Sequence, residues 1–333
     1  MRIHRQERAA DPKCLVRNRQ AVNVRGTAVL TQVKPEQDGG RDPVPSATVA
    51  TRPVPPHGAR ARRRLQRELE RAAQVQMSLL PDVSRPVGQF GLTSLYWPCE
   101  GLGGDLYDLA WRRDCAVLLV ADVMGHGAEA ALITMLVKAA FQDTAETTGE
   151  PGELLLGMNA RLRRMLPSRV FVAAAAARLE LEGPDIRLAN AGLPYPFLLH
   201  ASERRVEELR LDGRPLGLLD GQGEGFRPVG RLSLAPGDVL LISSDGIGSV
   251  ECACGQSFED CRMRQVLAEV AGQEGRKVID RLATQAVAFA RGRPLPDDIN
   301  LVAVSQPGRG PKPPVVAGVP LESTLARAAS GER

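Results

Sequence analysis

Acidic residues stand at the ends of apolar segments in four places along this sequence. They are Asp105 and Asp108 in "GGDLYD", Asp122 in "LLVAD", Asp245 in "LLISSD", and Asp297 and Asp298 in "PDDIN". A carboxylate at the end of a buried strand is costly unless it is paired, hydrogen-bonded or bound to a metal. One such aspartate is readily a turn or cap residue. Four such places, each beside a glycine or a second acid, indicate one common site.

The ligand atoms that these residues offer are all oxygens, and this decides the metal. Carboxylates with backbone carbonyls and water suit Mg²⁺ or Mn²⁺ and not a structural zinc site. A carboxylate that bridges two ions about 3.5–4 Å apart can hold a water between them as the nucleophile. The residues alone therefore predict a two-metal hydrolase of phosphate esters and leave its substrate open.

The elements that must position these acids follow Pro81. Short apolar runs predict strands at 115–123, 169–181, 185–192, 195–200, 238–246 and 299–304. Helical stretches are predicted at 127–148, 151–166, 259–272 and 276–291. The strands come in groups around a central helical pair, which favours an α+β layered sandwich over a doubly wound parallel sheet.

The two ends of the chain differ in composition from its middle. Residues 1–58 and 307–333 are rich in proline, glycine and small polar residues, so we expect disordered extensions there. Residues 59–81 predict a helix that Pro81 ends. Its seam at helical spacing consists of Leu65, Leu69, Ala72, Gln76 and Leu79. Because the alanine and the glutamine weaken this seam, packing on the chain's own domain and a short coiled coil that forms a homodimer both stay open.

Composition excludes several classes. A net charge of +4 over 333 residues gives no argument for a nucleic-acid partner, and no apolar run is long enough to predict a membrane span. The basic N-terminus lacks the apolar stretch of a secretory signal. Six cysteines make no dense disulfide framework, so we expect a reducing cytoplasm. Cys252, Cys254 and Cys261 lack the fourth ligand and the spacing of a zinc site, and we expect ordinary free thiols.

Seven segments in register resemble a known family. They are "VQMSLLP", "GGDLYDL", "ADVMGHGAEAAL", "NAGLPYPFLL", "GRPLGLL", "LAPGDVLLISSDGIGSVE" and "LPDDINLVAV". Across residues 66–305 the chain resembles the SpoIIE/RsbU-type branch of the PPM metal-dependent serine/threonine phosphatases. The resemblance implies two antiparallel sheets packed face to face and flanked by helices, with the phosphatase domain at 82–306 and the metal cluster at one end of the sandwich.

The resemblance also implies roles for the acids and glycines. Asp122 is similar to the aspartate that bridges two Mn²⁺ or Mg²⁺ ions, with the carbonyl of Val123 as a further ligand. The remaining ligands implied are Asp105 on one ion, and Asp245 and Asp297 on the other. Asp108 and Asp298 are implied as supports that orient waters. Gly104 and Gly246 would let the backbone pass close to the site.

The chain departs from the family pattern at positions that are not ligands. Leu193 follows "NAG" where the family often has histidine, and Ser244 replaces the usual threonine. We therefore expect an active enzyme. His126 is either an acid or phosphate contact or a histidine at a helix start. Arg214 is either a phosphate contact or a surface-loop residue.

The implied function is metal-dependent hydrolysis of phosphoserine or phosphothreonine, on a phosphoprotein of the anti-sigma-factor-antagonist type. Two alternatives stay open: a catalytically weak partner-binding module of the same fold, and a hydrolase of a small phosphate ester. Family members often carry an upstream sensor domain, for which residues 1–58 are too short and too polar. We therefore expect control by an activator protein that docks on the helix at 60–80, or by the dimer state.

Overall fold

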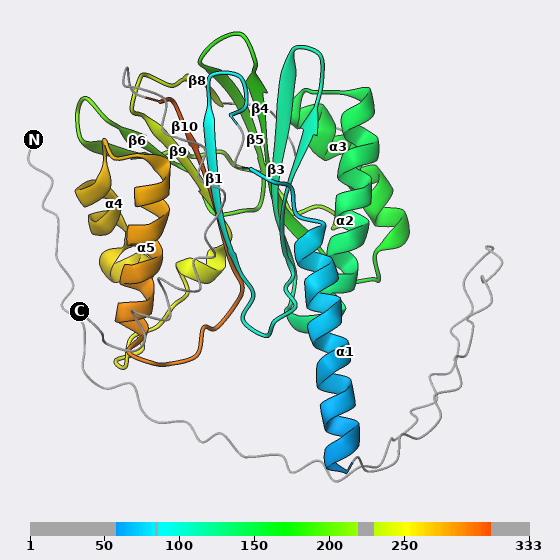
Figure 1. Cartoon of the computed structure of the whole chain (residues 1–333). Coiled ribbons are helices and arrows are strands. Elements are labelled where there is room, and N and C mark those ends of the chain that lie inside the picture. The colour runs from blue at the N-terminus through cyan, green and yellow to red at the C-terminus, as the bar shows by residue number, and fades with distance from the viewer. Residues whose placement is uncertain (1–57, 84–85, 219–229, 308–333) are drawn as a thin grey trace, which may run out of the picture. The chain divides into compact units, whose positions relative to one another are not determined.

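The described residues form two five-stranded antiparallel sheets (Figure 1). The computed structural model describes residues 58–83, 86–218 and 230–307. The first sheet has the order β2 (Asp105–Trp111), β3 (Cys115–Val123), β4 (Val172–Glu180), β5 (Asp185–Ala191) and β8 (Gly230–Ser233). The second has the order β1 (Gly91–Trp97), β10 (Ile299–Ser305), β9 (Val239–Ser243), β6 (Phe197–His200) and β7 (Arg205–Glu208).

Helices cover the outer face of each sheet (Figure 1). The first sheet carries α2 (Gly127–Thr147) and α3 (Pro151–Met165). The second carries α5 (Gly275–Ala290) and α4 (Arg264–Val270), the latter preceded by a single π-helical turn, η2 (Glu259–Met263). The helix α1 (Ala59–Ser78) precedes both sheets in the chain. This arrangement confirms the expected α+β sandwich of two antiparallel sheets flanked by helices.

The central strands are apolar on both faces because each is covered on both sides. In β3, Leu118 and Val120 face the second sheet, whereas Val117 and Leu119 pack against the helices. This double burial explains why the continuous apolar run at 115–123 predicted a strand with the bounds of β3.

Four strands are not predicted by the sequence pattern. β7 and β8 are short and lie at sheet edges, where few side chains are buried. β1 alternates only weakly between buried and partly exposed side chains. β2 is buried along most of its length, but Asp105 and Asp108 interrupt its apolar pattern, so the stretch reads as a glycine hinge.

The expectation of three free thiols near residue 250 is wrong for two of them. Cys252 and Cys254 form a disulfide with a Cα–Cα separation of 5.3 Å, while Cys261 is free and exposed. The reason is local: Glu251 pairs with Ser257, and the hairpin between them brings the two cysteines together.

Two further expectations concern the terminal extensions and membrane spans. The extensions predicted at 1–58 and 307–333 lie outside the described residues except for Gly58 and Pro307. Within the described ranges, none of the helices combines the length and the apolar character that a bilayer span requires.

Candidate active site

The four acidic places of the sequence meet at one end of the sandwich. Asp105, at the start of β2, lies directly opposite Asp122, near the end of β3, because the two strands are antiparallel. In the second sheet β9 ends at Ser243 and Asp245 follows two residues later, while Asp297 and Asp298 come just before β10. Since Ser243 pairs with Leu301 of β10, these acids also reach a common edge.

A cavity of about 720 Å³ opens at this end. The acidic side chains of its wall are Asp122, Glu208, Asp212, Asp245, Glu259 and Asp297. Among the described residues, no lysine, arginine or histidine lines it. The cavity is therefore negatively charged, which favours the binding of cations.

Asp105 lies just behind this wall. Its carboxylate is buried and accepts a 2.7 Å hydrogen bond from Oγ of Ser244, which does line the cavity. Burial, followed by the charge of Asp122, raises the pKa of Asp105 well above its usual range. Burial, followed by the charge of Asp245, raises the pKa of Asp122 to about 7. The pKa of Asp245 is raised too, by burial and then by Asp297. These carboxylates repel one another.

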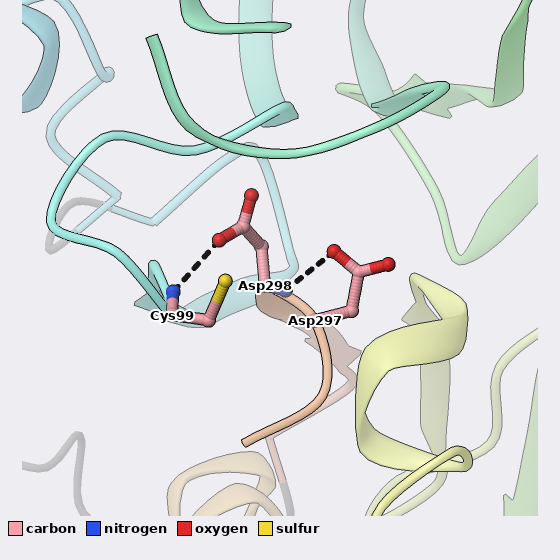
Figure 2. A group of neighbouring side chains, drawn as sticks. All are labelled: Cys99, Asp297 and Asp298. Atoms are coloured by element: carbon pink, nitrogen blue, oxygen red, sulfur yellow. Dashed lines mark hydrogen bonds between the residues drawn. The ribbon is translucent and has the colours of Figure 1, made fainter. Parts of the chain in front are cut away.

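Asp298 faces the backbone and not the cavity. Its Oδ1 accepts a hydrogen bond from the N–H of Cys99 at 2.7 Å, and its Oδ2 accepts one from the N–H of Gly104 at 2.6 Å. Figure 2 shows the first of these bonds, together with the bond from the Asp298 N–H to the Asp297 carboxylate. Asp298 thus fastens the glycine hinge, which carries Asp105, to the start of β10.

Cys99 joins these two acids in a compact group that sequence reasoning missed. One ligand atom from each of Cys99, Asp297 and Asp298 lies within 4.8 Å of the others (Figure 2). Burial, followed by the charge of Asp298, raises the pKa of the Cys99 thiol to about 12, so the thiol stays protonated near neutral pH. A neutral thiol is a poor ligand for a hard cation, which favours Asp297 over Cys99 as a ligand.

Both glycines singled out beside the acids sit where a side chain has no room. A Cβ on Gly246 would lie 1.8 Å from the carbonyl oxygen of Asp298. A Cβ on Gly104 would lie 2.8 Å from the carbonyl oxygens of Val123 and Gly125. The bare backbone at these two positions lets the acidic segments approach one another.

Asp108 does not belong to this group. Side chains alternate along β2, so Asp108 points to the helix-covered face, opposite to Asp105. Its buried carboxylate lies 2.7 Å from Nζ of Lys138 and accepts a 2.7 Å hydrogen bond from Gln142, both on α2. The expected support of the site by Asp108 is therefore corrected: Asp108 fastens α2 to the sheet.

The two suggested phosphate contacts lie outside the cavity wall. His126 is the N-cap residue of α2, and its Nδ1 lies 3.4 Å from the carboxylate of Glu100. Arg214 is exposed, while its neighbours Gly213 and Pro215 line the cavity. The geometry favours a helix-start histidine and a surface-loop arginine.

Gln76, a member of the helical seam of α1, makes a contact near the site that the sequence did not predict. It is buried, its Nε2 donates to the carbonyl of Gly103 at 2.7 Å, and its Oε1 accepts from the N–H of Gly103 at 3.1 Å. The one available signal was its polar character within an otherwise apolar helical seam.

The fold and the acidic cluster define a class of protein, the PPM or PP2C-type sandwich. The SiaA-PP2C domain of Pseudomonas aeruginosa superposes with a TM-score of 0.67 and is 25% identical, over 74% of this chain and 99% of that one. The family model "Stage II sporulation protein E (SpoIIE)" matches residues 112–307, more than half of the chain. The chain belongs to the SpoIIE family.

Curated relatives agree with this family. Phosphoserine phosphatase RsbU of Bacillus subtilis (strain 168) is 25% identical over 191 residues, which cover 57% of this chain and 56% of RsbU. Phosphoserine phosphatase RsbP of the same organism is 26% identical over 195 residues, which cover 56% of this chain and 47% of RsbP. The chain thus spans about half the length of the curated relatives it matches.

Proposed function

We propose that this protein is a metal-dependent serine/threonine protein phosphatase that hydrolyses phosphoserine or phosphothreonine. One observation carries the proposal: acids from both sheets converge on a cavity whose described wall holds no basic side chain. A phosphorylated substrate is anionic, so it can bind here only when cations offset both its charge and that of the wall. Membership of the SpoIIE family and the similarity to RsbU and RsbP support this reading.

The residues present fit two hard divalent cations, Mn²⁺ or Mg²⁺. The donor set consists of oxygens only, and the carboxylates raise one another's pKa without a neighbouring base in the cavity wall. The residues that would hold the ions are Asp105, Asp122, Asp245, Asp297 and, through its carbonyl, Val123. Bound ions would polarise the phosphoryl oxygens and lower the pKa of coordinated water toward neutrality.

The chain's own residues position these ligands. Ser244 donates to Asp105 and so fixes the orientation of that carboxylate. Asn190 closes the turn before the cavity by bonding both the N–H and the carbonyl of Leu193. Leu193 lines the cavity with an apolar side chain at the position where the family often has histidine. This position therefore offers no general acid.

The substrate, the regulators and the compartment belong to the same proposal. Similarity to RsbU supports a cytoplasmic phosphoprotein of the anti-sigma-factor-antagonist type as substrate. The leucines of the α1 seam support a docking surface for an activator or a second copy, since Leu65 is 53% and Leu69 42% exposed. The contact of Gln76 with Gly103 gives such a partner a route from the helix to the site.

The proposal is tested by p-nitrophenyl phosphate hydrolysis with and without Mn²⁺ or Mg²⁺. The Asp122→Asn variant should lose metal-dependent turnover, while Asp143→Asn, an exposed site on α2 paired with Arg161, should keep it. Retained activity in Asp122→Asn would contradict the site. Turnover on phosphorylated anti-sigma antagonists and on small phosphate esters then separates a protein phosphatase from a small-ester hydrolase. Binding of the phosphoprotein without turnover in excess Mn²⁺ would indicate the non-catalytic module.

A further inference from the structure

A second cavity, of about 450 Å³, is lined by three of the chain's six cysteines. They are Cys252 and Cys254, which form the disulfide, and Cys261, whose thiol is free and exposed. The rest of the wall comes largely from α5 and from the residues on either side of the cysteines. The two cysteines of the disulfide and the cysteine with the free thiol therefore border one open cavity.

The charge of this cavity is opposite to that of the acid-lined cavity. Arg262 and Arg291 line it, and no acidic residue does so among the described residues. Nε of Arg262 donates to Oε1 of Gln285 at 3.2 Å, which holds the guanidinium at the wall. In the described part of the chain, neither arginine forms an ion pair. The cavity is thus suited to an anion.

The three cysteines lie on two short segments. The disulfide closes the hairpin between Glu251 and Ser257, and Cys261 belongs to the π-helical turn η2. Single π-helical turns occur frequently at functional sites. On the proposed cytoplasmic location, a disulfide is typically transient, catalytic or redox-sensing. The cluster therefore has the composition of an exchange site.

We propose that this cavity is a thiol–disulfide exchange site for a small anionic thiol, of the class of carboxylate-bearing cysteine peptides. The thiolate of the small molecule attacks one sulfur of the Cys252–Cys254 disulfide, and the new S–S bond forms as the old one breaks. The other cysteine leaves as a thiolate and takes a proton from solvent. Attack by Cys261 on the mixed disulfide releases the small thiol and leaves a new internal disulfide. Each step exchanges one S–S bond for another, so no external oxidant is required.

Reduced glutathione is the probe for this site, because it carries carboxylates and one thiol. The full chain is mixed with glutathione, quenched with acid and measured by intact mass and peptide mapping. The acid quench traps the mixed disulfide before Cys261 resolves it, so we expect a single glutathione adduct that maps to Cys252 or Cys254. The Cys252→Ser variant, which has no disulfide to exchange, should form no adduct.

The arginines provide the selectivity test. The double variant Arg262→Gln, Arg291→Gln should react with glutathione about fivefold more slowly, as expected for the loss of two exposed charge contacts. Its rate with 2-mercaptoethanol, whose thiolate carries no further negative charge, should fall much less. Arg281→Gln, on α5 and paired with Glu269 outside the cavity, is the matched control.

Three outcomes would overturn the proposal. The first is alkylation of both Cys252 and Cys254 before any reductant is added, since no disulfide would then exist. The second is an adduct that maps to Cys99 or Cys115. The third is an arginine variant in which the rates with both thiols change equally. None of these readouts depends on phosphatase activity, so the proposal stands or falls separately from the proposed function.

Discussion

Gln76 and Gly103 are joined by a pair of hydrogen bonds that links the helix α1 to the acidic site. The amide side chain of Gln76 donates to the Gly103 carbonyl and accepts from its N–H, much as a neighbouring strand would. Gly103 lies two residues before Asp105 and also borders Asp298, whose Oδ2 a Cβ on Gly103 would approach to 2.7 Å. The position of α1 and the position of Asp105 are therefore mechanically connected.

The first prediction concerns this link. Gln76→Ala should leave the buried N–H and carbonyl of Gly103 without these partners, which lowers the free energy of unfolding by about 1–3 kcal/mol. It should also raise the Mn²⁺ concentration for half-maximal activity by about tenfold, the effect typical of residues that orient metal ligands. Urea unfolding and Mn²⁺ titration measure the two effects. Gln66→Ala, an exposed position of the same helix bonded to Glu70, should change neither. An unchanged Mn²⁺ requirement in Gln76→Ala would refute the link.

The second prediction separates the two acids of β2. Asp105→Asn should reduce metal-dependent turnover by about 100-fold or more, beyond the range for residues that only orient ligands. It should also stabilise the metal-free protein, because it removes one of several carboxylates that repel one another. Asp108→Asn should instead lower the free energy of unfolding by about 2 kcal/mol through loss of the Lys138 pair, with the metal requirement unchanged. Turnover and urea unfolding in EDTA measure both. Similar turnover losses in the two variants would show that the face assignment is wrong.

The third prediction concerns the close approach at Gly246. Gly246→Ala places a Cβ against the Asp298 carbonyl, a backbone atom that cannot move without shifting β10. We expect a loss of at least about 3 kcal/mol in unfolding free energy, within the range for strong overpacking. Gly248→Ala is the control, since its nearest contact, at 3.0 Å, is the end of the flexible Glu259 side chain. Thermal melts of the two variants give the comparison, and equal stability would contradict the expected clash.

The fourth prediction concerns pH. Glu180 accepts hydrogen bonds from Arg178 at 2.8 Å and from Arg187 at 2.6 Å, and these contacts, the Arg178 bond first, lower its pKa. A lowered folded-state pKa means that the stabilisation is present above the unfolded-state pKa and is lost as pH falls through the folded-state value. Glu180→Gln should therefore cost about 1 kcal/mol at neutral pH and flatten the loss of stability in acid.

Urea unfolding at several pH values below 7 measures this effect. Glu182→Gln, an exposed position two residues further on, serves as control and should leave the profile unchanged. An acid limb that is equally steep in Glu180→Gln and in the unsubstituted chain would speak against the role of Glu180.

The sequence was sufficient for the layers of the fold because the central strands carry long apolar runs. The run at 115–123 is such a case, and the helical stretch at 127–148 corresponds to α2. The sequence was not sufficient to predict β2. Asp105 and Asp108 lie on opposite faces of this strand, and both interrupt the apolar pattern by which a strand is predicted. Two acids three residues apart are close in the sequence, but in a strand their side chains point to opposite faces of the sheet.

The hydrogen-bond partners of individual acids could not be predicted from the sequence either. Asp297 and Asp298 are adjacent, yet only Asp297 faces the cavity, since the Asp298 carboxylate is used by the backbone of Cys99 and Gly104. That contact joins residues almost 200 positions apart, and no local pattern encodes it. The Cys252–Cys254 bond, in contrast, is local. It depends on a hairpin that the sequence of the turn predicts only weakly.

In the described wall of the large cavity every charged side chain is acidic, and this determines the order in which ion and substrate can bind. A phosphate monoester carries nearly two negative charges at neutral pH, so the wall repels it until cations have entered. On the proposed function, the protein then acts as a coincidence detector that responds only when the ion and the phosphoprotein are both present, with the ion first. Any change in the affinity of the site for that ion, including one caused by a movement of α1, would then change the rate of dephosphorylation without any contact with the phosphoprotein. The supply of divalent cations thereby becomes an input to the signalling circuit in its own right.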